Sequence, residues 1–218
     1  MFFRKNKSDI QRDLDYSIKT RLHQIKILAL LRNNLSGFSK DFMVPMAILK
    51  QNVNLENYIS TELTFFLNNK VNQTGYLFAF QATGPDILVR QSGVGVHGLT
   101  LLFIEAKRLP PTSPQDYVKT GIGRFKKEEH GKKDNIAAML GYVQKNDFSH
   151  WYGEVNSWII ALISDESQNP GWTEKEQINQ VQITDIGEYQ STHCRITKEP
   201  ITLHHFWINL CNDTLLPR

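Results

Sequence analysis

Two stretches of the chain set its expected topology: GPDILVR at residues 84–90 and LLFIEAKR at residues 101–108. The second stretch begins with four apolar residues and then carries a carboxylate and an amine two positions apart, Glu105 and Lys107. Because side chains alternate across a β-strand, we expect Glu105 and Lys107 on one face and Ala106 on the other. Either the charges form a surface salt bridge where the strand reaches solvent, or they belong to a site.

The surrounding residues predict three consecutive strands, over 75–82, 86–90 and 99–109. The glycine-rich residues 91–98 predict a hairpin connection between the second strand and the third. In an antiparallel pair, the start of one strand lies beside the end of the next. We therefore expect Asp86 to lie next to Glu105 and Lys107.

The N-terminal part of the chain is predicted to be helical. Apolar residues three and four positions apart indicate an amphipathic helix over 9–32, within an N-terminal helical extension over 1–50. This helix is expected to pack on the core or, alternatively, to present a basic face to DNA or to a partner subunit. A second helix is predicted over 54–69, with Asn54 as its N-cap.

The remaining elements are predicted from composition and pattern. The polar and basic residues 116–135 predict a loop with a short helical turn. A helix capped by Asp134 is predicted over 135–147, a buried strand over 157–164, and further strands and loops over 174–210.

The bulk composition is that of a globular protein. The 218 residues are 40% hydrophobic, and the net charge of +3 is too small to indicate nucleic-acid binding by itself. Cys194 and Cys211 lack the spacing of a zinc site and are interpreted as reduced thiols. No stretch is long and apolar enough for a signal peptide or a membrane span, so we expect a cytoplasmic protein without membrane attachment.

The predicted group of Asp86, Glu105 and Lys107 suits phosphodiester hydrolysis. Two adjacent carboxylates repel each other unless a positive charge compensates, and Mg²⁺ binds one or two carboxylates together with waters and substrate phosphate. Such a metal lowers the pKa of bound water and stabilises the transition state, while a neighbouring lysine orients the water or neutralises developing charge. We therefore expect Mg²⁺ as the cofactor, with Mn²⁺ able to replace it.

Pro85-Asp86 followed by Glu105-Ala106-Lys107 resembles the signature of the PD-(D/E)XK nuclease superfamily. The resemblance covers roughly residues 54–165 and implies an α/β, restriction-endonuclease-like fold within a nuclease domain over 51–218. That fold has an αβββαβ core with a mixed central sheet, here with extra C-terminal strands. The resemblance implies that Asp86 and Glu105 bind the metal, that the carbonyl of Ala106 adds a ligand, and that Lys107 positions the attacking water.

The resemblance suggests two further catalytic positions. The first helix often supplies another acidic residue, for which Glu62 is the first choice and Glu56 the second. These two residues are six positions apart and face different sides of the helix. Gln144 is the candidate for a polar residue on the helix after the third strand. The alternative for each is an ordinary solvent-exposed side chain.

The basic loop after the third strand is expected to contact DNA phosphates. Glu128 and Glu129 dilute its charge, so a solvated loop is the alternative. The candidate DNA-binding residues are Lys119, Arg124, Lys126, Lys127, His130, Lys132 and Lys133.

Together, the resemblance implies a Mg²⁺-dependent endonuclease that cleaves DNA in restriction or anti-phage defence. A protein partner or a second copy of the chain would complete it. The alternative is a catalytically silent nucleic-acid-binding or structural subunit that keeps the fold. The intact Asp86, Glu105 and Lys107 favour the enzyme. The sequence leaves open whether the substrate is DNA or RNA, and whether it is single- or double-stranded.

Overall fold

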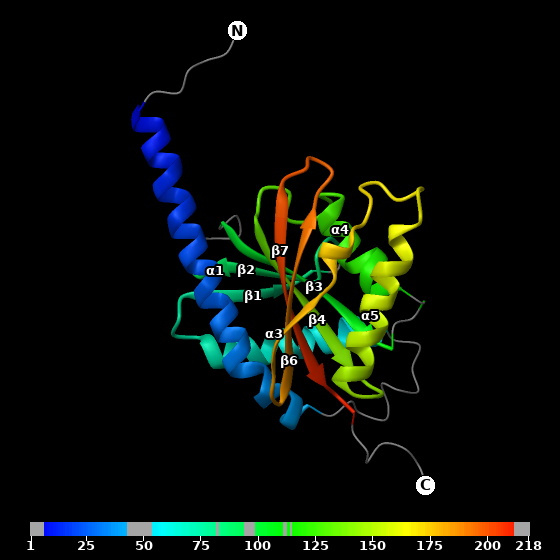
Figure 1. Cartoon of the computed structure of the whole chain (residues 1–218). Coiled ribbons are helices and arrows are strands. Elements are labelled where there is room, and N and C mark those ends of the chain that lie inside the picture. Colours follow the sequence, from blue (N-terminus) through cyan, green and yellow to red (C-terminus); the bar gives the residue numbers. More distant parts are fainter. Residues whose placement is uncertain are drawn as a thin grey trace.

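The computed structural model describes residues 7–42, 54–81, 83–93, 99–110, 113 and 115–211, with side chains from residue 15 onward. Residues 43–50 of the predicted N-terminal extension and residues 94–98 of the predicted hairpin connection lie outside this part. Figure 1 shows the arrangement of the elements.

One mixed sheet of seven strands organises the chain, in the order β1-β2-β3-β4-β7-β6-β5. The three central strands, β3, β4 and β7, run parallel, and antiparallel pairs flank them on both sides. The expected α/β class and mixed central sheet are therefore present. The strands are β1 (Tyr76–Phe80), β2 (Ile87–Gln91), β3 (Thr100–Leu109), β4 (Ile136–Val143), β5 (Asn179–Ile183), β6 (Ile186–Cys194) and β7 (Pro200–Asn209).

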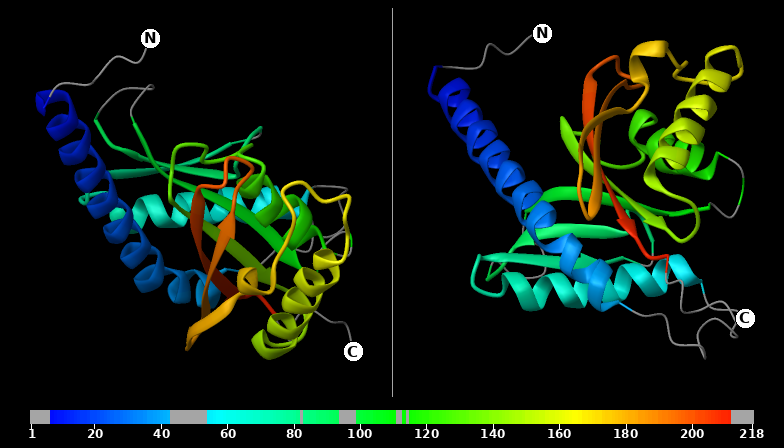
Figure 2. Two further views of the ribbon diagram at one scale, coloured as in Figure 1. Left: turned by 45° about the horizontal axis from the view of Figure 1, so that its top comes forward. Right: turned by 60° about the horizontal axis from the view of Figure 1, so that its bottom comes forward.

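Helices cover both faces of this sheet, as Figure 2 shows. Two long helices, α1 (Lys7–Asp41) and α3 (Leu55–Val71), pack on one face. The opposite face carries the π-helical turn η1 (Tyr117–Ile122), the short helix α4 (Gly123–Lys126) and α5 (Phe148–Ile163). A single 3₁₀ turn, η2 (Glu174–Glu176), precedes β5.

Strand β3 contributes side chains to the cores on both faces. Leu102, Ile104 and Ala106 are buried in the core beneath α1 and α3, whereas Leu109 is buried in the core beneath η1 and α5. Because side chains alternate, Glu105 lies on the η1 side together with Leu109. This agrees with the expectation that Ala106 faces away from Glu105 and Lys107.

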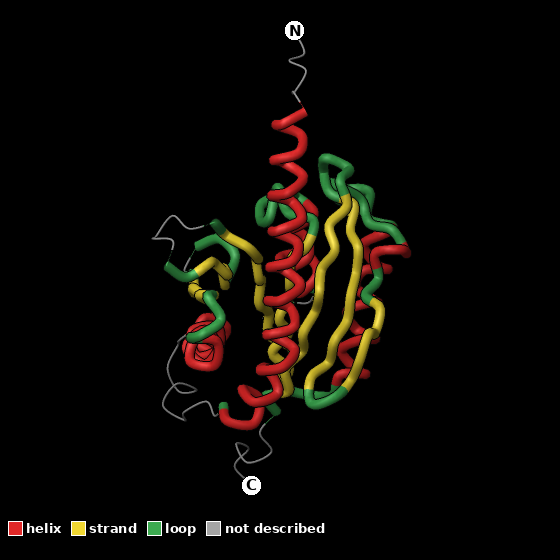
Figure 3. The backbone as a smooth tube through the Cα atoms, turned by 90° about the vertical axis from the view of Figure 1, so that its left-hand side faces the viewer, coloured by secondary structure: helices red, strands yellow, loops and turns green. Residues whose placement is uncertain are grey.

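Helix α1 is only partly embedded in the core. Leu28, Leu31 and Leu35 are buried against the sheet, and Figure 3 shows the helix in front of the strands with its N-terminal end extending beyond them. Ile18 and Leu22, which were predicted on the same apolar stripe, are more than half exposed. The predicted packing on the core is therefore confirmed for the second half of α1. None of the helices in the described residues combines the length and the apolar character needed to cross a membrane.

Two predicted elements are of the wrong type. The predicted helix over 135–147 is instead strand β4, whose residues after Ile136 are all buried because helices cover both faces of the central strands. Asp134 therefore caps no helix. The predicted strand over 157–164 belongs to helix α5, whose N-cap Asp147 accepts the backbone N–H of His150 at 2.8 Å.

The order helix, three strands, helix, strand is nevertheless observed. Its first helix is α3, whose N-cap Asn54 accepts the backbone N–H groups of Glu56 and Asn57, as predicted. Its second helical segment is formed by η1 and α4, upstream of the predicted residues, and its fourth strand is β4. This order alone does not establish a restriction-endonuclease-like core.

Candidate functional site

The candidate site lies where β2 and β3 separate. The pairing of the two strands ends at Ile87 and Ile104, while β3 continues to Leu109. The next part of β3 therefore has no β2 residue beside it, and its backbone N–H groups on this edge need other acceptors. Two carboxylates supply them, which brings acidic side chains from two separate elements to one point.

Asp86 and Glu56 are these acceptors. Asp86 Oδ2 accepts the backbone N–H of Ala106 at 2.7 Å, and Glu56 Oε2 accepts the backbone N–H of Arg108 at 3.1 Å. Glu56 comes from the first turn of α3. The edge of β3 thus fixes both carboxylates beside Lys107, which lies between Ala106 and Arg108 in the chain.

Lys107 joins the acidic groups. Its Nζ lies 3.0 Å from Glu105 Oε1 and 3.1 Å from Glu56 Oε1. Glu105 is completely buried, and Lys107 and Asp86 are 7% and 8% exposed. Buried charges at such distances interact strongly because little water screens them.

Two further basic side chains reach Glu105 from the segment that follows β3. Arg124 donates a hydrogen bond from its Nη1 to Glu105 Oε1 at 2.8 Å. His130 Nε2 lies 3.4 Å from Glu105 Oε2, close enough for an ion pair but without hydrogen-bond geometry. Glu105 Oε2 is therefore a buried oxygen with no hydrogen-bond partner in the described part of the chain.

The pKa values of the carboxyl groups of Asp86 and Glu105 are shifted in opposite directions. Burial, and then the charge of Glu105, raise the pKa of Asp86 to about 6, against the opposing effects of Lys107 and the Ala106 N–H. Burial alone would also raise the pKa of Glu105, but His130, Lys107 and Arg124 lower it below its usual value. Glu105 therefore stays ionised at neutral pH, whereas the carboxyl group of Asp86 titrates at a pH close to neutral.

Lys107 keeps its proton. Burial favours the neutral amine, but the charges of Glu105, Glu56 and Asp86 outweigh burial and raise the lysine pKa above its usual value. An ammonium group that stays protonated cannot act as a general base at neutral pH. It can donate hydrogen bonds to a water or stabilise negative charge.

The structure brings Glu105 and Lys107 into contact, and Asp86 lies close enough for both charges to shift its pKa. The catalytic and metal-binding roles of the three residues stay predictions. Ala106 donates its N–H to Asp86, and the role of its carbonyl as a metal ligand stays a prediction. The choice between the two glutamates of α3 was wrong. Glu56 contacts Lys107, whereas Glu62 lies near Tyr58, whose pKa is raised by burial and by the charge of Glu62.

Gln144 lies at the end of β4 and not on the predicted helix. Its Oε1 accepts a hydrogen bond from Arg108 Nε at 2.7 Å, and its backbone N–H bonds the carbonyl of Leu109. It therefore supports the end of β3, and its contact with the site runs through Arg108.

The predicted DNA-binding loop is divided among several environments. Arg124 and His130 face Glu105, as described above. Lys126 is 1% exposed, and its Nζ bonds both carboxylate oxygens of Glu176, at 2.7 and 2.6 Å, so it is unavailable to DNA. The exposed lysines are Lys119 and Lys127, which line a small pocket of about 180 Å³, and Lys132 and Lys133, which line a larger cleft.

Sequence reasoning missed the acidic partner Glu176 and gave Glu56 second place. The position of Glu56, two residues after the N-cap, was the available signal, because the first turn of a helix favours acidic residues. No comparable signal marked Glu176, which meets Lys126 only through the tertiary fold.

The carboxylates of Asp86 and Glu105 are the donors that a metal ion would find at this site. Among the described residues, no group of three or more His, Cys, Asp and Glu side chains is arranged to hold a metal ion. Mg²⁺, however, commonly uses one or two carboxylates and completes its shell with water and substrate. The raised pKa of Asp86, and the Oε2 of Glu105 that accepts no hydrogen bond from the described residues, both mark negative charge that a cation would stabilise.

Comparison of the chain with known protein families, with curated proteins and with solved structures gives no match. The functional inference therefore rests on the geometry of the place where β2 and β3 separate, beside Asp86, Glu105 and Lys107. We call this place the β2–β3 fork.

Proposed function

We propose that this protein is a metal-dependent nuclease whose active site is the β2–β3 fork. One observation carries the proposal: two buried carboxylates, Asp86 and Glu105, converge with a buried ammonium, Lys107, at the point where one strand outruns its neighbour. Burying three ionisable groups together costs stability, and such clusters are concentrated at functional sites. The resemblance of their spacing to the PD-(D/E)XK signature supports the same reaction class.

Each residue has a defined role in this proposal. Asp86 and Glu105 would hold Mg²⁺, which supplies an activated water and stabilises the charge on the phosphate. Lys107, which remains protonated, orients the attacking water and offsets the charge that develops on the phosphate. Glu56 holds the ammonium of Lys107 in place from α3.

Arg124 gives the site a second positive charge, and its guanidinium compensates the charge of Glu105 when no substrate is present. His130 Nε2 lies 3.4 Å from the other carboxylate oxygen of Glu105. The side chain of Arg124 is partly exposed, so a substrate phosphate can replace Glu105 as its partner. The assignment to restriction or antiviral defence rests on the sequence resemblance alone.

Cleavage of plasmid and single-stranded DNA in the presence of Mg²⁺ or Mn²⁺ tests this proposal. The wild type should cleave with either metal and stop when EDTA is added. Asp86→Asn, which keeps the hydrogen-bond acceptor for Ala106 N–H but removes the charge, should lower the rate at least about 100-fold. Binding of Mn²⁺, followed by electron paramagnetic resonance, should weaken in the same variant. Cleavage that persists in Asp86→Asn would reject this site.

A nucleic-acid-binding subunit without catalysis is the second candidate. It is favoured by the near-complete pairing of the charges: Glu105 Oε1 contacts both Lys107 and Arg124, while Asp86 and Glu56 accept backbone N–H groups. In that case the wild type would bind nucleic acid, Mn²⁺ would not bind at the fork, and no cleavage would occur with any divalent metal.

A further inference from the structure

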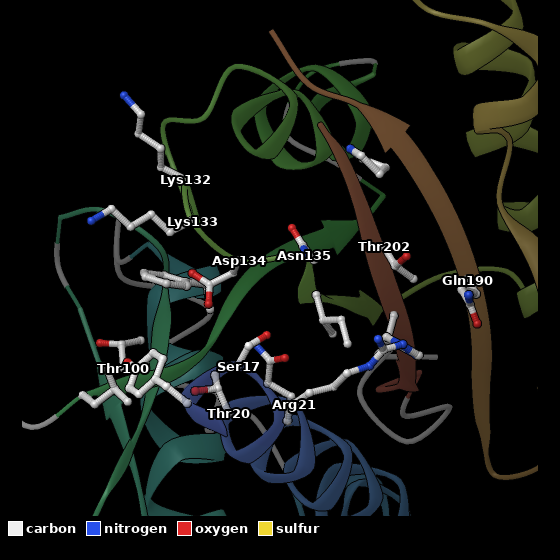
Figure 4. Close-up of a pocket in the computed structure, with 17 residues that line it drawn as sticks. Ser17, Thr20, Arg21, Thr100, Lys132, Lys133, Asp134, Asn135, Gln190 and Thr202 are labelled. Atoms are coloured by element: carbon white, nitrogen blue, oxygen red, sulfur yellow. The ribbon is translucent and has the colours of Figure 1, made fainter. Parts of the chain in front are cut away.

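A cleft of about 860 Å³ opens between the first half of α1, the start of β3, the loop before β4 and the β6–β7 pair. Figure 4 shows this cleft, with Arg21 extending from α1 towards β7 and the loop that carries Lys132 and Lys133 on another side. None of its lining residues belongs to the cluster around Glu105.

The face of α1 that turns towards the sheet changes character along the helix. Thr20 and Gln24 line the cleft, while Leu28, Leu31 and Leu35 continue the same face at spacings of three and four and are buried in the core. A helix that only packed against the sheet would need apolar residues along the whole of this face. The polar residues on the first half of this helix face indicate that the cleft holds water or a polar ligand.

The cleft has a net positive charge. Arg21, Lys132 and Lys133 line it, and Asp134 is the carboxylate among its lining residues. The other polar groups are uncharged hydrogen-bonding side chains that can contact phosphate and sugar oxygens. They include Ser17, Thr20, Gln24, Gln190, Thr202 and His204.

A buried arginine fixes the loop that carries the two lysines. Arg195 is 3% exposed, and its Nη1 donates hydrogen bonds to the carbonyls of Gly131, Lys132 and Asp134 at 3.2, 3.1 and 3.1 Å. Its Nε also bonds the carbonyl of Glu199 at 3.1 Å. The backbone that carries Lys132 and Lys133 is therefore held in a fixed conformation before a ligand binds, which lowers the entropy cost of binding an anion there.

Two segments of the chain carry residues of both the cleft and the candidate active site. Phe103 lines the cleft and lies two residues before Glu105 on β3, a distance of about 7 Å along the strand. His130 contacts Glu105 and lies two residues before Lys132. Tyr16 and Phe103 also add aromatic rings to the lining, on which unpaired bases can stack.

We infer that this cleft binds a single strand of nucleic acid and leads it to the β2–β3 fork. Basic groups combined with aromatic rings are the means by which proteins hold single strands. A cleft of about 860 Å³ is small beside a duplex, whose major groove alone is about 12 Å wide, so a single strand is the occupant that we propose. This inference deepens the proposed nuclease function, because it names the form of the substrate.

Fluorescence anisotropy with EDTA present measures binding without cleavage. The probes are a labelled oligothymidylate, the matching oligouridylate and a duplex of equal length. The wild type should bind the single strands more tightly than the duplex, and Lys132→Gln combined with Lys133→Gln should weaken single-strand binding about tenfold at low salt. Arg21→Gln should weaken it too, whereas Lys26→Gln, an exposed cation on the same helix outside the cleft, should not.

The outcomes separate this inference from the proposed function. Equal binding of duplex and single strand, or equal effects of Arg21→Gln and Lys26→Gln, would overturn the cleft assignment even if the protein cleaves DNA. Selective binding that the cleft variants abolish would support the cleft even if no cleavage occurred. Tighter binding of one oligonucleotide over the other would identify DNA or RNA as the preferred strand.

Discussion

Glu56 on α3 and Lys107 on β3 meet at 3.1 Å, Oε1 to Nζ, although 51 residues separate them in the sequence. The second oxygen of Glu56 accepts the backbone N–H of Arg108. One carboxylate thus ties the start of the helix both to the side chain and to the backbone of the strand that carries the site.

Replacing Glu56 by glutamine should impair the site, whereas the same change at Glu62 should not. Glu56→Gln removes one of the negative charges that keep Lys107 protonated and in place. We expect a loss of cleavage rate of about tenfold or more, with a smaller change in substrate affinity. Glu62→Gln is the matched control on the same helix. Equal activity of the two variants in a cleavage assay would argue that Glu56 only anchors the helix.

Asp86→Asn should stabilise the fold while it inactivates the protein. The raised pKa of Asp86 means that the folded state disfavours its ionised form. Its contribution to stability therefore falls as pH rises from the unfolded pKa near 4 through the folded pKa of about 6. The asparagine lacks this penalty, so at pH 7 its free energy of unfolding should exceed that of the wild type by about 3 kcal/mol.

Urea unfolding in EDTA at several pH values measures this difference. The advantage of Asp86→Asn should shrink as the pH is lowered from 7 to 4, because the wild-type carboxyl then becomes protonated. If the asparagine variant is instead less stable than the wild type at pH 7, Asp86 is a structural cap of the β3 edge and its charge is required for folding.

Lys126 should matter for stability and not for DNA contact. Lys126→Met leaves Glu176 as an uncompensated buried charge, for which a loss of about 3–5 kcal/mol is typical. The neighbouring Lys127 is exposed, and Lys127→Met should change the free energy of unfolding by less than about 0.5 kcal/mol. Chemical denaturation of both variants checks this. A stable Lys126→Met protein with weakened nucleic-acid affinity would restore the predicted DNA-binding role of this lysine.

Strands β1, β2 and β3 and the position of Asp86 near Glu105 could be predicted from the sequence, because they depend on local alternation and a short connection. The type of β4 and α5 could not be read with the same certainty. The run Ile136–Val143 contains alanine, methionine and leucine, which favour helices, but it is buried on both sides as a central strand. The isoleucines of α5 suggested a strand, whereas its buried residues Trp151, Val155 and Ile159 are spaced as on a helix.

The rest of the site depends on contacts between distant residues. Sequence spacing placed Lys126 within a basic cluster, but whether a lysine lies in solvent depends on a partner such as Glu176, 50 residues away. In the same way, Arg195 fixes the loop over residues 131–134 through hydrogen bonds to its carbonyls, and no local sequence pattern predicts these contacts.

The cleavage rate of Lys107→Met under single-turnover conditions, with a labelled single strand and Mg²⁺, tests the central claim most directly. Lys175→Met, which removes an exposed cation, is the control, and circular dichroism confirms that each variant is folded. Asp86→Asn serves as the second site variant if Lys107→Met does not fold. We expect wild type and Lys175→Met to cleave at equal rates and Lys107→Met to be slower by a factor of at least about 100. Cleavage by Lys107→Met at the wild-type rate would contradict the assignment of the β2–β3 fork as the active site.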